Sequence, residues 1–427
     1  MIATTLALLL GLMALAIPVA AAMGVLGLVL AKAYSFLPVH GVAGEIAWTS
    51  SNEFLLVALP LFILLGELLL RSGLAEKMYE ALARWLSWLP GGLMHSNIAA
   101  CAMFAATSGS SVATAATVGT VALPQAARFG YNERLFLGTL AAGGTLGILI
   151  PPSINMIVYA VLTNTSVPKL YLAGIFPGVL LALMFMSVVA VACAWRPEWG
   201  GKRVRATFSA CLAGLVHLGP PLAIFLVVVG SIYAGLATPT EAASLGVMAG
   251  LALAWWTGAL GWKMLGEALL GTMRSTGMIM LIIVAAYFLN FVMSSIGLTT
   301  KLTDTIQNLG LSKWQMLFAV IVFYLILGCF METLSMMITT IPIIAPVMQA
   351  LGFDMVWFGI VVIVLIEAAL ITPPVGLNLF VVQNLRSRGS MNDVIVGSLP
   401  FVLAMLLLLL LLALFPGLAL WLPRVFS

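Results

Sequence analysis

Residues 141–160 read AAGGTLGILIPPSINMIVYA, and residues 363–382 read IVLIEAALITPPVGLNLFVV. Each is an apolar stretch of helical length with a proline pair in its middle. Proline has no N–H group, so each pair removes two helical hydrogen bonds and leaves two carbonyl groups without donors. The residue before each pair is also pushed away from helical geometry. We therefore expect two broken helices, at residues 135–163 and 355–385, with breaks at Pro151, Pro152, Pro373 and Pro374.

The composition places these helices in a lipid bilayer. Of 427 residues, 63% are apolar and 7% are charged, and the mean hydropathy is +1.18. Soluble domains carry roughly 25% charged residues. Apolar stretches recur along the whole chain, so the first one is not expected to be a cleaved export signal. The net charge is only +4, and no basic stripe indicates a nucleic-acid partner. We expect an all-α, multi-pass membrane protein.

The two proline pairs belong to an internal repeat. They are 222 positions apart, and other prolines and glycines recur at almost the same spacing. Such constant spacing over most of the chain indicates a duplication. We expect a first repeat at residues 1–193, a linker at 194–206 and a second repeat at 207–427. The matched positions are Pro124 with Pro346, Gly130 with Gly352, Pro177 with Pro400, Gly73 with Gly297, and Pro18 with Pro239.

The distribution of Lys and Arg predicts how the repeats are oriented. Basic residues gather on the cytoplasmic side of membrane proteins, and the densest basic cluster is in the linker, at Arg196, Lys202, Arg203 and Arg205. Each half has five apolar segments, so the second half is expected to be inverted relative to the first. With the linker in the cytoplasm, both termini are predicted to be periplasmic, and the protein to lie in a bacterial inner membrane. Inverted repeats with broken helices are typical of secondary transporters.

Two pairs of short apolar segments are predicted to enter the membrane without crossing it. The first pair, at about 92–127, meets at Ser108–Ser111, and the second, at about 314–350, meets near 329–335. A segment of about 16 residues reaches only ~24 Å, less than the ~30 Å hydrocarbon core. We therefore expect two re-entrant hairpins. Residues 71–87 mix charged and apolar side chains, which predicts a helix lying at the membrane interface.

The carbonyl groups released at the breaks are candidate cation ligands. Unpaired carbonyls at membrane depth are tolerated only where another group replaces the lost donor, and Na⁺ is bound by such carbonyls in other broken helices. A simple proline kink packed against its neighbours is the alternative. The occurrence of two symmetric breaks, each with a hydroxyl-bearing hairpin tip in its own repeat, favours ion sites.

The helix that follows each break, and each hairpin tip, presents free N–H groups. Helix N-termini attract anions, so four of them meeting in one place would hold an anion without Lys or Arg. The two asparagines add amides, although an interhelical hydrogen bond is the alternative for each. Glu332 is the best candidate among the intramembrane acids, whereas Glu67 and Glu241 are interpreted as structural and the role of Glu367 stays open. The expected substrate-binding residues are Ser110, Ser111, Asn155, Glu332, Thr333 and Asn378.

Four motifs, in this order, closely resemble the large membrane (M) subunit of tripartite ATP-independent periplasmic (TRAP) transporters of the C4-dicarboxylate permease type. They are SGSSVATAATVG at 108–119, GILIPPSINMIVYA at 147–160, ATPTEAA at 237–243 and LITPPVGLNLF at 370–380. The resemblance covers almost the whole chain. It implies an elevator-type symporter, in which two hairpins and two broken helices carry Na⁺ and a small organic anion past a fixed scaffold. C4-dicarboxylates, sialic acid and similar carboxylates are the expected substrates.

The resemblance also implies ligands and partners. Two or more Na⁺ are expected, and the two sites divide between the repeats. A small four-helix membrane subunit (Q type) and a soluble periplasmic binding protein (P type) are the expected partners; since no extra four-helix segment precedes the first repeat, the small subunit is expected to be a separate chain. The implied Na⁺ ligands are Ser108, Gly109, Gly147, Ile150 and Ser153 with the rest of the first tip, and Gly328, Ala369, Thr372 and Val375 with the second tip.

Two other functions are compatible with parts of this pattern. A stand-alone Na⁺/dicarboxylate symporter of the same superfamily would share the hairpins and broken helices. An intramembrane enzyme would need a nucleophile with a base, or a metal site, at one depth. The three histidines form no HExxH motif or pair, so enzyme chemistry has no support, and a transporter is the prediction.

Overall fold

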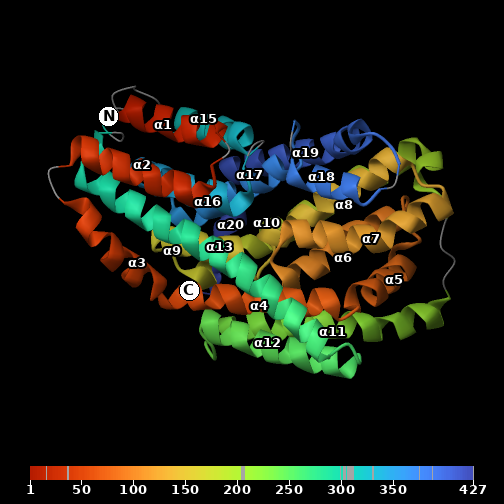
Figure 1. Ribbon diagram of the computed structural model, residues 1–427. Helices are drawn as coiled ribbons and strands as arrows, with labels where there is room; N and C mark the ends of the chain where they lie inside the picture. Colours follow the sequence, from red (N-terminus) through yellow and green to blue (C-terminus); the bar gives the residue numbers. More distant parts are fainter. Residues whose placement is uncertain are drawn as a thin grey trace.

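The computed structural model describes the chain except for residues 16, 36–37, 203–206, 299, 302–303, 305–311, 329–330, 375, 387 and 427, and except for the side chains of residues 2, 6, 10, 13, 14, 40 and 106–108. Every regular element assigned among the described residues is helical (Figure 1), so the all-α expectation is confirmed.

The first half of the chain supplies one hairpin and one broken helix. α6 and α7 form the hairpin, and α8 and α9 are the two parts of the broken helix. The helices are α1 (Ile2–Ala14), α2 (Val19–Tyr34), α3 (Ala43–Ser51), α4 (Ala58–Arg71), α5 (Leu74–Leu86), α6 (Leu93–Ser108), α7 (Ser111–Phe129), α8 (Glu133–Leu149), α9 (Ile154–Thr163) and α10 (Val167–Trp195).

The second half repeats this order. α15 and α16 form the second hairpin, and α17 and α18 the second broken helix. The helices are α11 (Phe208–Tyr233), α12 (Pro239–Trp256), α13 (Trp262–Ser295), α15 (Lys313–Leu327), α16 (Thr333–Ala350), α17 (Met355–Leu370), α18 (Leu377–Asn384), α19 (Met391–Leu414) and α20 (Gly417–Val425). The two hairpins and two broken helices therefore confirm the predicted fold class.

The repeats exchange helices with each other. The broken helix of the first half packs against the second half: α8 lies against α19, and α9 against α16. The reverse pairs are also present, because α17 lies against α10 and α18 against α7. Ion pairs hold one of these contacts, from Arg134 Nε to Asp393 Oδ1 (2.9 Å) and from Arg386 Nη2 to Glu133 Oε1 (2.7 Å). This reciprocal packing is the arrangement expected of two repeats related by a twofold axis.

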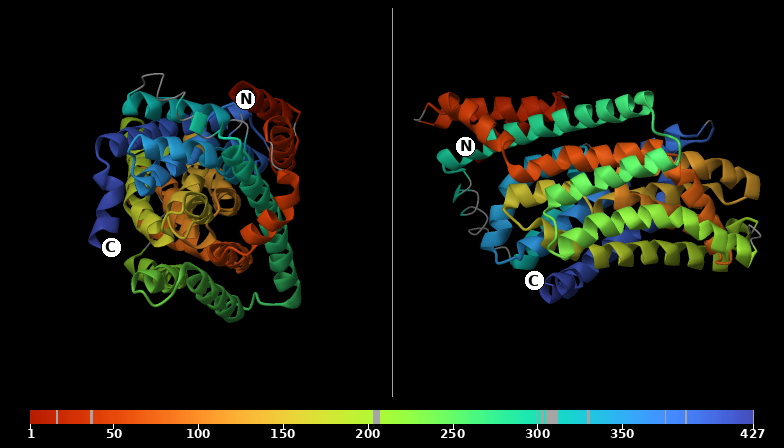
Figure 2. Two further views of the ribbon diagram at one scale, coloured as in Figure 1. Left: turned by 90° about the vertical axis from the view of Figure 1, so that its left-hand side faces the viewer. Right: turned by 90° about the horizontal axis from the view of Figure 1, so that it is seen from below.

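A second group of helices surrounds this core. α4 packs against α12 and α13, and α2 packs against α13. In the left-hand view of Figure 2, α11–α13 and the N-terminal helices lie outside the round central group formed by the hairpins and broken helices. The hairpins and broken helices thus form an inner group, and α2, α4, α12 and α13 belong to an outer one.

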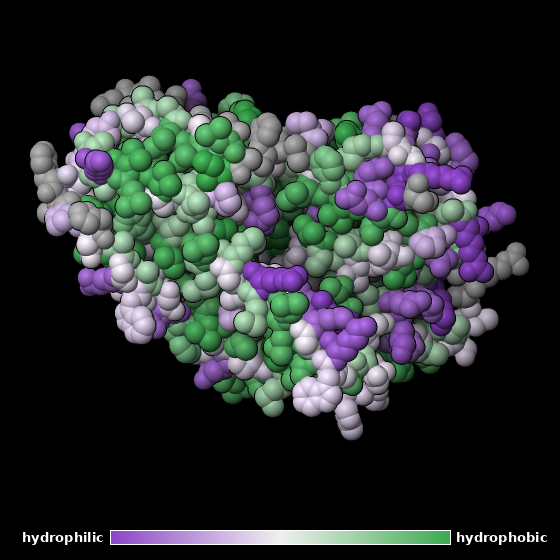
Figure 3. Space-filling view, in the orientation of Figure 1, coloured by the Kyte–Doolittle hydropathy of each residue, from purple (hydrophilic) through white to green (hydrophobic). Residues whose placement is uncertain are grey.

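The outer surface is apolar. Leu212, Leu281 and Leu403 are exposed by 54%, 64% and 67% on α11, α13 and α19, which is the reverse of a soluble protein and indicates lipid contact. Figure 3 shows hydrophobic residues over much of one face, and hydrophilic residues gathered toward the end where α5 lies and α8 begins. Among the described residues, six helices are long and apolar enough to cross a membrane, or seven if the bent pair α8–α9 counts as one span.

Several helices are shorter or longer than one membrane crossing requires. α1 and α2 have 13 and 16 residues, or ~20 and ~24 Å, which is less than the ~30 Å core. α13 has 34 residues, because the charged stretch at its start contains no proline and continues into the apolar part as one helix. α5 is the predicted interfacial helix, yet its apolar face is buried against α6 and α11, with Glu76, Lys77 and Glu80 exposed. That apolar face therefore contacts protein instead of lipid.

Candidate functional site

The first helix break lies where the proline pair predicted it. α8 ends at Leu149 and α9 begins at Ile154, and the two axes are bent by 43°. The Ser153 hydroxyl caps α9 by accepting from the Met156 N–H (3.4 Å). The Pro151–Pro152 peptide bond is cis. Neither proline can donate to the carbonyls one turn earlier, so Gly147 and Ile148 present oxygens at the break.

The tip of the first hairpin lies directly on this break. Gly109 ends α6 with a positive φ of 61°, and its backbone packs against the Pro152 carbonyl. Gly147 contacts the main chain of Ser110: a Cβ there would lie 2.9 Å from the Ser110 carbonyl oxygen. The Ser110 hydroxyl caps α7 at the Ala113 N–H (3.4 Å). The predicted ligands Gly109, Gly147 and Ser153 are thus brought together, whereas the Ser108 side chain is outside the described residues.

The second break has the same design with different details. α17 ends at Leu370 and α18 begins at Leu377, and the Pro373–Pro374 bond is also cis. The Thr372 hydroxyl donates to the Ala368 carbonyl (2.7 Å), which leaves its lone pairs available to a cation. The Ala369 carbonyl, predicted to be released, accepts from the Thr372 N–H (3.3 Å), so only its second lone pair remains. Val375 lies outside the described residues.

The tip of the second hairpin is held by a carboxylate. Glu332 is the N-cap of α16: its Oε2 accepts from the Ser335 N–H (3.1 Å) and its Oε1 from the Thr333 hydroxyl (2.8 Å). This cap starts the helix at Thr333, three residues before the predicted start at residue 336. Gly328 packs against the Ala369 methyl group. In this repeat, the glycine that allows the close approach is therefore on the hairpin (Gly328). In the first repeat it is on the broken helix (Gly147).

Both tips and both breaks border one small cavity. Its volume is about 80 Å³. Five of the six predicted substrate-binding residues line it; the sixth, Asn378, is not among its lining residues. Instead, Asn378 Nδ2 donates to the Ser111 hydroxyl (2.8 Å) and to the Ala141 carbonyl (3.1 Å), so it holds the first tip against α8. The described lining residues are Gly109, Ser110, Ser111, Val112, Ile148, Ile154, Asn155, Glu332, Thr333, Leu334, Leu370 and Leu377.

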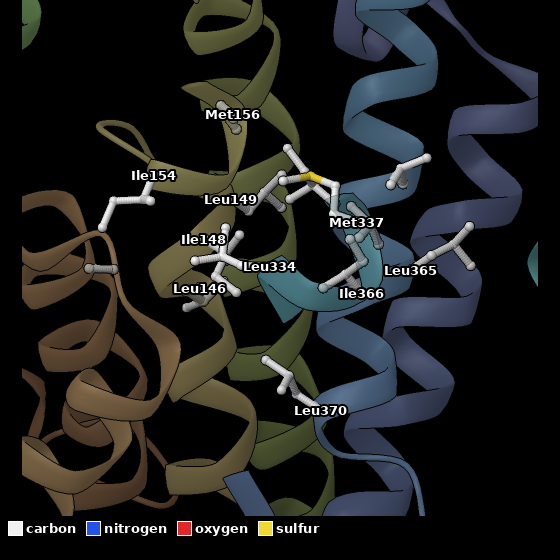
Figure 4. Packing of buried hydrophobic residues seen from close by; sticks show 14 of the residues in the cluster. Leu146, Ile148, Leu149, Ile154, Met156, Leu334, Met337, Leu365, Ile366 and Leu370 are labelled. Atoms are coloured by element: carbon white, nitrogen blue, oxygen red, sulfur yellow. The ribbon is translucent and has the colours of Figure 1, made fainter. Parts of the chain in front are cut away.

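Half of this lining is aliphatic, which the sequence analysis did not anticipate. Figure 4 shows Ile148, Leu334 and Leu370 between α8, α16 and α17, with Ile154 to one side. Ile154 and Leu334 each directly follow a residue that caps or starts a helix. Their positions next to a predicted break and a predicted tip could have identified Ile154 and Leu334 as lining residues.

The polar part of the lining includes an unused donor. Asn155 is 3% exposed, and its Nδ2 has no hydrogen-bond partner among the described residues. Glu332 is the one charged residue among the described lining residues. A buried polar group without a partner is costly in a folded protein, so this amide is available to a ligand that accepts hydrogen bonds.

The other intramembrane acids are not among the described residues that line the cavity. Glu67 pairs with Arg71, which also lies 3.7 Å from Glu267 on α13. Glu241 forms a capping box with Thr238 at the start of α12. Glu367 is fully buried on α17, and neither carboxyl oxygen has a hydrogen-bond partner among the described residues. The first two acids therefore have structural partners.

Two larger cavities flank the C-terminal half of α7, with volumes of about 690 and 650 Å³. Both are lined by Thr120 and Pro124. One is bordered by Arg386, Arg388 and Glu133, and the other by Arg84, Arg128, Glu76 and Glu80. The central cavity is thus small, and the larger spaces, lined by charges of both signs, lie at the other end of the first hairpin.

Hairpin tips seated on broken helices around a central polar cavity define a membrane transporter. The chain belongs to the family described as the tripartite ATP-independent periplasmic transporter, DctM component, whose model matches residues 6–418. The C4-dicarboxylate TRAP transporter large permease protein of Pseudomonas aeruginosa is 35% identical over 376 residues, covering 88% of this chain and 87% of that protein. The protein of the same name from Rhodobacter capsulatus is 33% identical, covering 98% and 97%.

A solved structure has the same fold. The YdaH transporter of Alcanivorax borkumensis superposes with a TM-score of 0.54, covering 85% of this chain and 87% of that one, at 17% sequence identity. Its title reports an unusual topology. The family resemblance expected from the four motifs is confirmed. The prediction that the chain is a transporter permease, and not an enzyme, is confirmed with it.

Proposed function

We propose that this chain carries out Na⁺-coupled uptake of a small organic anion through the inner membrane, as the large subunit of a three-component system. The observation that supports this function best is the convergence of two hairpin tips and two helix breaks on one cavity, in which a buried amide donor is unused. The hairpins and broken helices would move as one body past the group formed by α2, α4, α12 and α13, and the two larger cavities beside α7 would lead the anion to the cytoplasm.

The coupling ions would bind where the hairpin tips meet the breaks. At the first site, Gly147 brings the released carbonyls of α8 against the Ser110 main chain. At the second, Gly328 allows the same approach to Ala369, with the Thr372 hydroxyl next to it. Oxygen ligands from carbonyls and hydroxyls suit a hard cation, and carbonyls unwound at helix breaks bind Na⁺ in related architectures.

Replacing Thr372 by alanine is expected to raise the Na⁺ concentration for half-maximal uptake by about tenfold. A hydrogen bond to a charged group contributes about 1.5 kcal/mol, which corresponds to a tenfold change in binding. Thr272→Ala is the matched control, because the Thr272 hydroxyl makes the same bond to an alanine carbonyl one turn earlier (Ala268, 2.8 Å) but lies on α13. Uptake measured against Na⁺ concentration in proteoliposomes tests this. Equal effects of the two variants would show that Thr372 supplies no side-chain ligand.

The proposed partners follow from the character of the cavity. Backbone groups, serine, threonine and asparagine hold a carboxylate but give little discrimination among similar anions. The binding protein would then make the main selection. The family name states that the system is tripartite, and one relative, the isethionate permease protein DctMQ of Oleidesulfovibrio alaskensis, extends well beyond the matched region, which covers 62% of it.

Proteoliposomes with this chain alone are therefore expected to take up no substrate. Uptake should appear when the small membrane subunit and the loaded periplasmic protein are both added, and it should require a Na⁺ gradient. Omission of either partner is the control. Robust Na⁺-driven uptake of free substrate by the purified chain would support a stand-alone symporter. Uptake that proceeds equally well in choline with only a proton gradient would rule out Na⁺ coupling.

A further inference from the structure

We propose that the central cavity selects a monocarboxylate with an aliphatic body, and that Glu332 selects against a second negative charge on the substrate. This inference rests on the proposed function, since it names the substrate class of the same site. It differs from the substrate in the names of the two permeases compared above, which are C4-dicarboxylates carrying a carboxylate at each end.

One group of lining residues can receive a carboxylate. The Asn155 Nδ2 donor is buried and unpaired among the described residues, and it lies in the lining together with Ser110 and Ser111. The Ser111 hydroxyl accepts from Asn378 Nδ2, so its own O–H remains to donate. These groups offer donors to one carboxylate without a lysine or arginine, which suits a group that must later be released.

Another polar part of the lining is itself an anion. The Glu332 carboxylate accepts from the Ser335 N–H and the Thr333 hydroxyl at the start of α16. It therefore occupies the helix N-terminus that would otherwise attract a substrate anion. A second substrate carboxylate in this small cavity would lie near Glu332, and repulsion between like charges is stronger beside a low-dielectric protein interior than in water. A substrate group that is apolar, or that donates a hydrogen bond, meets no such repulsion.

The rest of the lining forms a largely aliphatic wall. A carboxylate facing this wall would lose its water without gaining hydrogen bonds, which is strongly unfavourable. An aliphatic body would be favoured by the same surface. The residues that form this wall are Val112, Ile148, Ile154, Leu334, Leu370 and Leu377.

The charges of the loaded site lead to the same substrate class. With the two Na⁺ proposed above, the negative charges of Glu332 and of one substrate carboxylate are fully balanced. A dicarboxylate would leave one negative charge uncompensated within the membrane. Since an unpaired charge is expensive in a low-dielectric interior, the monoanion is the form that the transporter can carry at lower cost.

The test compares two acids with equal numbers of non-hydrogen atoms, 3-methyl-2-oxobutanoate and succinate. The complex of this chain with its small membrane subunit, in lipid nanodiscs with Na⁺, is titrated with each acid while thermal unfolding is followed. The monoanion is expected to give half-maximal protection at a concentration about tenfold lower than succinate, which corresponds to 1.4 kcal/mol. In the Glu332→Gln variant, the concentration of succinate that gives half-maximal protection is expected to fall toward that of the monoanion. Leu334→Ser should weaken protection by the monoanion alone.

Glu241→Gln is the matched control. Glu241 also accepts hydrogen bonds at the start of a helix, but it is exposed, caps α12 and is not among the cavity lining residues, so the ratio between the two acids should stay at its wild-type value. Protection by succinate that equals or exceeds that of the monoanion in the wild-type complex overturns the inference and leaves the transport function intact. Absence of protection by Na⁺ and by both acids overturns the proposed function together with the inference.

Discussion

Replacement of Gly147 by alanine is expected to reduce Na⁺-dependent uptake by about a hundredfold. The added Cβ would lie 2.9 Å from the Ser110 carbonyl oxygen and 3.1 Å from the Ser111 nitrogen. These are main-chain atoms of the hairpin tip, so they cannot turn aside as a flexible side chain could. Overpacking of this kind costs about 1–3 kcal/mol, and here the strain would separate the tip from the break that it is proposed to close. The Na⁺ titration of uptake measures the effect.

Gly277→Ala provides the control for this substitution. Gly277 is on α13, and nothing lies within 4 Å of the position its Cβ would take. Uptake by Gly277→Ala should stay within about twofold of the wild type, since an exposed Gly→Ala change in a helix alters stability by only ~1 kcal/mol. Normal Na⁺ affinity in Gly147→Ala would contradict the proposal that an ion site forms between α8 and the first tip.

Replacement of Gly397 by valine is expected to prevent the chain from reaching its folded state. Gly397 on α19 and Gly138 on α8 meet where these helices cross: a Cβ on Gly397 would overlap the Arg134 carbonyl, and one on Gly138 would overlap Gly397. Three added carbon atoms would force the helices apart at a cost of ~3 kcal/mol or more, which is a large part of a typical folding free energy of about 5–15 kcal/mol. Size-exclusion profile and thermal unfolding in detergent report the loss.

The control for this variant is Gly266→Val. Gly266 lies on α13 with open space around it, so valine should be tolerated there and the purified protein should stay monodisperse. A Gly397→Val protein with a wild-type unfolding temperature would show that α8 and α19 do not cross as closely as described here.

The sequence predicted the parts of the site that local chemistry determines. A proline pair ends a helix wherever it stands, and Gly109 with Ser110 both ends α6 and caps α7, so the breaks and the first tip are within two residues of their predicted positions. Glu332 shows the limit of this reasoning. Its place at a tip was predicted, but its hydrogen bonds to Ser335 and Thr333 depend on a helix start three residues earlier than expected.

Features that depend on tertiary packing were not predictable in the same way. Asn155 and Asn378 have similar positions in the two repeats, but only Asn155 lines the cavity, because Asn378 is turned toward Ser111 and Ala141. The aliphatic wall depends on which faces of α8, α16 and α17 meet, and each of these helices is mostly apolar, without one strongly polar face. A helix without a polar face gives no periodic signal of its orientation.

The exchange of helices between the repeats has a consequence for how the protein is made. Ribosomes deliver the first half to the membrane before the second, yet α8 and α9 find some of their main partners, α19 and α16, only in the second half. The glycine surface of Gly138 must therefore wait in the bilayer until Gly397 has been synthesised. Domains that are continuous in sequence can fold as they emerge; this chain, by contrast, can complete its central cavity, which both halves line, only when Leu377 has been inserted.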